Sequence, residues 1–106
     1  MMRVLFLCTD GRALSATAAQ IFEKPGLSTD FAGISPDADD NLSEDQIHWA
    51  NEIMVMEHRH ATRLNDRFGR QLAGKKIVVL DIRDRYTFME PGLISELTEK
   101  AGPQLP

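Results

Sequence analysis

Cys8 is the residue whose type and position best suit covalent chemistry, because it lies between a strand-like and a helix-like pattern of apolar residues. Residues 4–7 form a continuous apolar run, which predicts a strand buried on both faces of a parallel sheet. Apolar residues then recur at helical spacing over residues 14–22. A cysteine between a strand and a helix N-terminus faces amide N–H groups and the positive end of the helix dipole. We therefore expect a lowered pKa for Cys8 and a thiolate that can act as a nucleophile.

The loop after Cys8 has the features of an anion-binding turn. Gly11 allows a positive φ, which suits a tight turn before the helix. Ser15 could cap the helix or donate its hydroxyl to the thiolate, and the two roles are compatible. The positions expected to surround a bound oxyanion are Thr9, Asp10, Gly11, Arg12, Ala13 and Leu14.

Strand-like and helix-like segments alternate along the rest of the chain. This alternation predicts an α/β protein in which helices cover both faces of a four-stranded parallel sheet, a three-layer α/β/α fold. Ligands of such sheets bind at the carboxyl ends of the strands, which is the edge that holds Cys8. The strands are expected at residues 4–7, 27–34, 52–56 and 77–80, and the helices at 14–22, 43–50, 58–72 and 90–101.

Length and composition favour one small globular domain. The chain has 106 residues, 42% of them hydrophobic, so we expect a single domain over residues 1–106. No apolar run is long enough for a membrane span, and the N-terminus lacks the pattern of a secretory signal. The single cysteine permits no internal disulfide and fits a reducing compartment. We therefore expect a cytoplasmic protein without membrane contact.

One predicted helix carries a stripe of positive charge at helical spacing. Residues 58–76 have a net charge of +5 although the whole chain has −4, so the remainder carries −9. Such a stripe is either a solvated face or a docking surface for an acidic protein partner, and the overall negative charge disfavours nucleic acid. The stripe consists of Arg59, Arg63, Arg67 and Arg70.

Neither the histidines nor the acidic loop predicts a metal site. His58 and His60 are two residues apart at a helix start, so they point in different directions, and we expect both to be exposed. Asp37, Asp39 and Asp40 lack the spacing of a calcium-binding loop and are expected to be solvated. We expect no metal and no cofactor.

The strand, Cys8, the loop, Ser15 and the helix together resemble the phosphate loop of the low-molecular-weight protein tyrosine phosphatases, in particular their short bacterial branch. The family loop has the pattern Cys-x5-Arg-Ser, and Cys8 and Ser15 match its cysteine and serine at the same spacing. Leu14 stands at the position of the arginine. The resemblance, with right-handed crossovers, implies a phosphatase fold with strand order 2-1-3-4.

A second stretch, residues 81–89, resembles the loop that carries the general acid of these phosphatases. The resemblance implies that Asp84 is the general acid and that Tyr86 is an aromatic wall of the substrate slot. Arg83 and Arg85 flank Asp84, and we expect them to favour its ionised form and weaken it as a proton donor. The alternative is an ordinary exposed acid at Asp84 and a core-edge residue at Tyr86.

Three functions remain open from the sequence. The first is a phosphatase-fold protein, a pseudophosphatase, in which the loss of the arginine weakens or removes catalysis. It either keeps a weak oxyanion pocket that binds a phosphate or phosphorylated ligand, or serves as an interaction module. The second is an active tyrosine phosphatase with Cys8 as nucleophile, Asp84 as acid and Arg12 as a substitute clamp. The third is thiol redox chemistry such as arsenate reduction, which fits least because the chain has no second cysteine.

Overall fold

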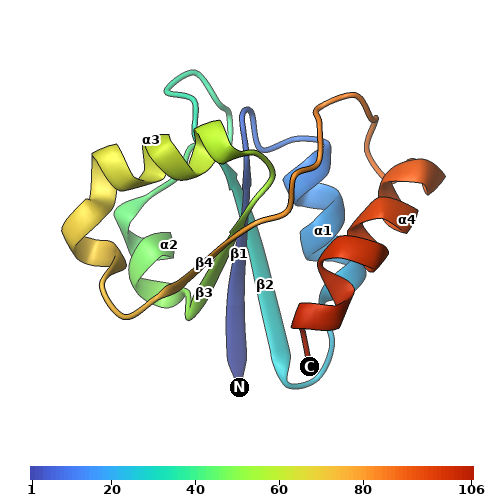
Figure 1. The fold of residues 1–106 in the computed structure, drawn as a ribbon, viewed down its shortest axis with the longest axis horizontal. Helices are drawn as coiled ribbons and strands as arrows, with labels where there is room; N and C mark the ends of the chain where they lie inside the picture. The colour runs from blue at the N-terminus through green and yellow to red at the C-terminus, as the bar shows by residue number, and fades with distance from the viewer.

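The structure, a computed structural model, describes all 106 residues and contains one parallel sheet with helices on both faces (Figure 1). The strand order is β2-β1-β3-β4, and all three neighbouring pairs are parallel. The predicted three-layer α/β/α fold and the order 2-1-3-4 are both confirmed. The strands are β1 (Met2–Cys8), β2 (Leu27–Gly33), β3 (Glu52–Val55) and β4 (Lys76–Val79).

The helices begin and end close to the predicted positions, and local sequence explains their starts. Ser43 and Gln46 form a reciprocal capping box at the second helix, and Pro91 opens the last helix in its first turn. None of the helices is long and apolar enough to cross a bilayer. The helices are α1 (Leu14–Phe22), α2 (Glu44–Trp49), α3 (His58–Phe68) and α4 (Pro91–Lys100), with 3-10 turns η1 (Gly69–Leu72) and η2 (Gly102–Gln104).

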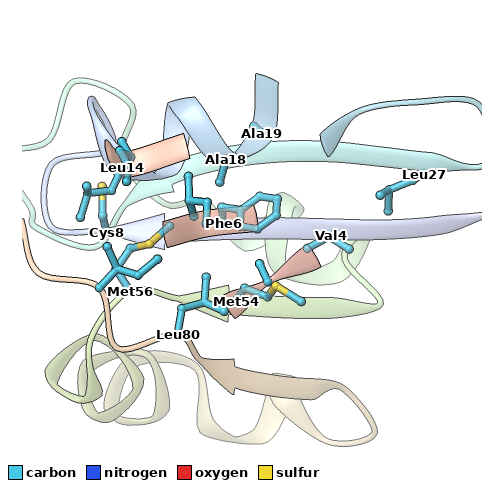
Figure 2. Packing of buried hydrophobic residues seen from close by; sticks show 14 residues of the cluster. Val4, Phe6, Cys8, Leu14, Ala18, Ala19, Leu27, Met54, Met56 and Leu80 are labelled. Atoms are coloured by element: carbon cyan, nitrogen blue, oxygen red, sulfur yellow. The ribbon is translucent and has the colours of Figure 1, made fainter. Parts of the chain in front are cut away.

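Alternate residues of β1 belong to two different hydrophobic clusters, one on each face of the sheet. Val4, Phe6 and Cys8 pack on the face covered by α1 and α4, as Figure 2 shows for the labelled side chains. Leu5 and Leu7 pack on the opposite face with residues of α2 and α3. Burial on both faces is the physical reason for the unbroken apolar run in the sequence.

The loops that follow β1, β2 and β4 meet at the carboxyl edge of the sheet (Figure 1). The end of β1 is tied to the segment after β2 by two backbone hydrogen bonds. Ile34 N–H donates to the Cys8 carbonyl at 2.9 Å, and Ser35 N–H donates to the Thr9 carbonyl at 2.9 Å. These bonds bring the loop after Cys8 against the end of the neighbouring strand.

Two glycines make this close approach possible. Gly11 has φ +75°, and a Cβ on it would lie 2.7 Å from the Gly33 nitrogen. A Cβ on Gly33 would lie 2.6 Å from the Asp10 carbonyl carbon and 2.5 Å from the Ala38 Cβ. Side chains at either position would therefore push the loop away from β2.

We predict that Gly33→Ala lowers the free energy of unfolding by about 1–3 kcal/mol, because the added methyl group overlaps backbone atoms. Urea denaturation measures the change. Gly69→Ala is the matched control, since the nearest atom to its added Cβ would be 3.7 Å away. A Gly33→Ala variant as stable as the control would contradict the close approach.

Candidate functional site

Cys8 lies at the centre of a small hydrogen-bonded group formed by the loop and the start of α1. Its Sγ is 3.0 Å from the Ser15 hydroxyl oxygen, and the Gly11 N–H donates to the Sγ at 3.2 Å. Cys8 and Ser15 are both buried. The structure thus brings Ser15 to Cys8, while the residue before α1 is Ala13, so Ser15 is not the helix cap. Of the two roles predicted for Ser15, only the contact with the cysteine is present.

The expected lowering of the Cys8 pKa is wrong. Burial raises the pKa of the Cys8 thiol, and the nearby Asp10 carboxylate raises it further. Hydrogen bonds from Ser15 and Gly11 act in the opposite direction but do not offset the loss of solvation. The favoured resting form at neutral pH is the thiol.

Asp10 places a negative charge inside the loop. Its Oδ1 lies 3.9 Å from the Cys8 Sγ and accepts a hydrogen bond from the Arg12 N–H at 3.0 Å. This carboxylate oxygen therefore takes one of the amide donors that a bound oxyanion would use. The amides of Asp10 and Ala13 have no acceptor within the chain, so two donors near the start of α1 are unengaged.

The loop contains no free cation beside Cys8. Leu14 is completely buried and belongs to the same hydrophobic cluster as Cys8 and Met56, with which it gathers at one end of the cluster in Figure 2. The Arg12 guanidinium pairs with Asp39 at 2.6 Å, and both side chains are largely exposed. The side chain of Arg12 is thus engaged away from the cysteine, with a carboxylate of the acidic loop.

Asp84 lies near the loop after Cys8, as predicted, but its pKa is shifted in the direction opposite to the expected one. Although its side chain is exposed, partial desolvation raises the pKa of Asp84, and the charges of Asp10 and Glu57 raise it further. The positive charge of Arg59 acts in the opposite direction and lowers the pKa of Asp84. The expectation that Arg83 and Arg85 would favour the ionised form is therefore wrong. Arg85 is directed to Glu96 on α4, at 3.7 Å.

The loop that carries Asp84 is held by backbone contacts on both sides. Ile82 N–H donates to the Met56 carbonyl at 2.8 Å, and Met89 N–H donates to the buried Thr17 hydroxyl of α1 at 2.9 Å. Thr17 is a positioning residue that the sequence did not suggest, because its partner is 72 positions away. The two contacts keep the Asp84 loop near the start of α1.

Tyr86 packs toward α4. Its hydroxyl donates to Glu96 at 2.6 Å, the Arg85 guanidinium lies over its ring, and the ring contacts the core cluster below α1 and α4. These contacts agree with a residue at the edge of the core. Its role as a wall of a substrate slot stays a prediction.

His60 is a site residue that the sequence analysis placed wrongly on the surface. It is 1% exposed, its Nδ1 accepts from the Glu57 N–H at 3.0 Å, and its Nε2 lies 2.9 Å from the Thr9 hydroxyl oxygen. Because Nδ1 is an acceptor, Nε2 carries the proton and donates to Thr9. The Thr9 hydroxyl hydrogen is then free to point toward a ligand. Glu57 and His60 are three residues apart at the start of a helix, which is the spacing of a capping box. That spacing was the signal in the sequence that His60 folds back toward the helix start.

Comparison with known proteins finds likeness in structure alone: no protein-family model and no curated protein matches the chain. YwlE arginine phosphatase from Geobacillus stearothermophilus has a TM-score of 0.67 and 21% identity, covering 98% of this chain and 95% of that one. The Drosophila arginine phosphatase DARP has a TM-score of 0.63 and 15% identity, covering 93% and 90%.

A tyrosine phosphatase has the same fold. SP-PTP, a low-molecular-weight protein tyrosine phosphatase from Streptococcus pyogenes, has a TM-score of 0.64 and 12% identity, covering 97% of this chain and 85% of that one. The chain therefore has the low-molecular-weight phosphatase fold, as the resemblance of its loop implied.

We predict that the stability of the chain falls as the pH drops from about 6.5 to about 4, partly because of His60. Burial, together with Arg59 and Arg63, lowers the pKa of His60 to about 4 from the ordinary 6.5. In that window the unfolded state binds a proton that the folded state does not, so the cost at pH 4 is on the order of 3 kcal/mol. Urea denaturation at several pH values measures it.

His60→Gln should reduce this pH dependence, whereas His58→Gln, at an exposed residue, should leave it unchanged. Equal slopes for the native chain and His60→Gln would show that His60 is not buried as a neutral ring.

We predict that Asp10→Asn makes Cys8 more reactive near neutral pH, because removal of the carboxylate lowers the pKa of the thiol while the amide oxygen can still accept from Arg12 N–H. The rate of alkylation by iodoacetamide as a function of pH measures the change, and the single cysteine makes the readout specific. Asp37→Asn in the exposed acidic loop is the control. An unchanged profile would contradict the assigned effect of Asp10.

Proposed function

We propose that this chain is a phosphatase-fold protein that keeps an oxyanion pocket at the loop from Cys8 to Ser15 and has lost most phosphatase catalysis. The observation that carries the proposal is the complete burial of Leu14 in the core, at the position where the resembled loop has an arginine. We place the protein in the cytoplasm, where a reducing environment keeps Cys8 as a thiol.

The missing arginine matters for two reasons. A guanidinium binds two phosphate oxygens in a fixed fork, and its charge offsets the repulsion between a thiolate and a phosphate dianion. Leu14 provides neither, and Asp10 adds a negative charge beside the sulfur. By analogy with other cationic clamps on transferring phosphoryl groups, this loss costs on the order of 10³–10⁵ in rate.

Arg12 is a poor substitute for that arginine. A phosphate group would have to compete with Asp39 for its guanidinium, and the Arg12 side chain is 66% exposed. The free amides of Asp10 and Ala13 and the N-terminus of α1 remain available to a weakly held oxyanion. A phosphate or phosphorylated ligand that binds without being turned over fits this set of groups.

The alternative is an active cysteine-dependent phosphatase. It is favoured by the 3.0 Å contact between Ser15 and Cys8 and by the raised pKa of Asp84, which suits a proton donor. In that reaction the Cys8 thiolate attacks phosphorus, the leaving oxygen takes the proton of Asp84, and water then hydrolyses the cysteinyl phosphate. The solved structures of the same fold include arginine and tyrosine phosphatases, so both phosphoarginine and phosphotyrosine are substrates to test.

We predict that the native chain hydrolyses an aryl phosphate very slowly and that Leu14→Arg raises the rate on the order of 10²-fold, because the substitution restores the cationic clamp. Steady-state hydrolysis between mildly acidic and neutral pH measures this, with phosphotyrosine and phosphoarginine as further substrates. Cys8→Ser should remove the gain when combined with Leu14→Arg.

Leu14→Met is the matched control, because it keeps an apolar side chain in the core and adds no charge. Circular dichroism establishes that each variant is folded before its rate is compared. Fast turnover by the native chain that Cys8→Ser abolishes would overturn the proposal in favour of the active phosphatase.

A further inference from the structure

A groove runs from the phosphate loop along α3. It begins as a cavity of about 470 Å³ beside Thr9, and a second cavity of about 240 Å³ adjoins it, sharing Ile34 and Arg63. We call these two cavities together the α3 groove. One wall is α3, with Arg59, Arg63, Asp66 and Arg67, and the other is the segment after β2, with Ile34 and Pro36. Thr9, in the loop after β1, lines the first cavity.

The α3 groove is positively charged in a chain whose net charge is −4. It has three arginines and one acid, Asp66. Arg59 is paired with Glu57 at 2.8 Å, and Arg67 donates to the Ile34 carbonyl at 3.0 Å. Arg63 is exposed and makes neither a salt bridge nor a hydrogen bond. The central cation of the groove is therefore available to a ligand.

The arginines of the groove are spaced to suit an extended chain. Arg59, Arg63 and Arg67 are four residues apart on one helix, so they follow one another at about 6 Å along the axis. Alternate residues of an extended peptide are about 6.6 Å apart and point the same way. Acidic side chains at alternate positions can therefore meet successive arginines.

We propose that the α3 groove docks an extended acidic segment of a partner protein, whose alternate Asp or Glu side chains pair with Arg59, Arg63 and Arg67. One end of the segment then lies at Thr9, next to Cys8, so docking presents a neighbouring residue of the partner to the phosphate loop. The proposal goes beyond the function of the loop and does not depend on whether Cys8 is catalytic.

Charge and shape favour a protein segment over nucleic acid as the occupant. The chain outside residues 58–76 carries −9, which repels a long polyanion but not a short segment confined to the groove. The large hydrophobic side chains that are exposed are Met1 and Phe88, and Phe88 lies beside α1, so the groove offers no exposed ring for base stacking.

Arg70 provides a matched internal control. The sequence placed it on the same helix as the other three arginines, but α3 ends at Phe68 and Arg70 lies in η1. It is exposed and lines neither cavity of the groove. Arg63→Gln and Arg70→Gln therefore remove the same charge from nearby positions, one inside the groove and one outside it.

The test is fluorescence polarisation with a labelled peptide of about seven residues that has Glu at alternate positions. We expect salt-sensitive binding that Arg63→Gln weakens about fivefold and Arg70→Gln at most about twofold. A peptide with Gln in place of each Glu should bind much more weakly. Cys8→Ser should bind the acidic peptide as the native chain does, which separates this proposal from the function of the loop.

Four outcomes would overturn the proposal. No binding of the acidic peptide at low salt, or equal binding of the Gln peptide, would mean that the groove does not recognise carboxylates. Equal losses for Arg63→Gln and Arg70→Gln would mean diffuse attraction to the whole basic segment. Tighter binding of a single-stranded oligonucleotide of the same charge would assign the surface to nucleic acid.

Discussion

The site depends on the close approach of the loop after Cys8 to the end of β2. Because Gly11 and Gly33 lack side chains, the two backbones lie nearly in contact, and the Ile34 N–H bonds to the Cys8 carbonyl. This contact fixes the turn that directs the Gly11 amide at the Cys8 sulfur and brings Ser15 to it. The surroundings of Cys8 are thus produced by packing of the loop after β1 against the end of β2.

The charges in the loop differ from those of the Cys-x5-Arg-Ser pattern that it resembles. Leu14 contributes to the core instead of carrying a cation, and Asp10 places a carboxylate near the sulfur. Both features disfavour the thiolate form of Cys8. An unpaired positive charge, that of Arg63 on α3, lies in the groove that begins at Thr9. The chain therefore combines the low-molecular-weight phosphatase fold with a loop in which no cation is free beside Cys8.

The sequence predicted some of the contacts around Cys8, missed others such as that of His60 with Thr9, and gave the wrong direction for two pKa values. It correctly brought Ser15 to Cys8 and Asp84 to the same edge of the sheet, because both follow from the alternation of strands and helices. It assigned the wrong direction to the pKa of Cys8 and of Asp84. Burial is the largest cause of both shifts, and it depends on which distant segments pack around each group, which local spacing does not encode. Asp10, two residues from Cys8, is a smaller cause that acts in the same direction.

The sequence by itself determined the layers and the position of Cys8 at the carboxyl edge, since these follow from hydrophobic periodicity. The strand order was implied by the resemblance to the phosphatases together with the handedness of the crossovers. Only the tertiary structure decided that His60 is buried against Thr9 and that Arg63 lines a groove while Arg70 does not. Periodicity reports which face of an element is apolar. The neighbours that surround a polar side chain come from distant segments, and their positions are set by packing.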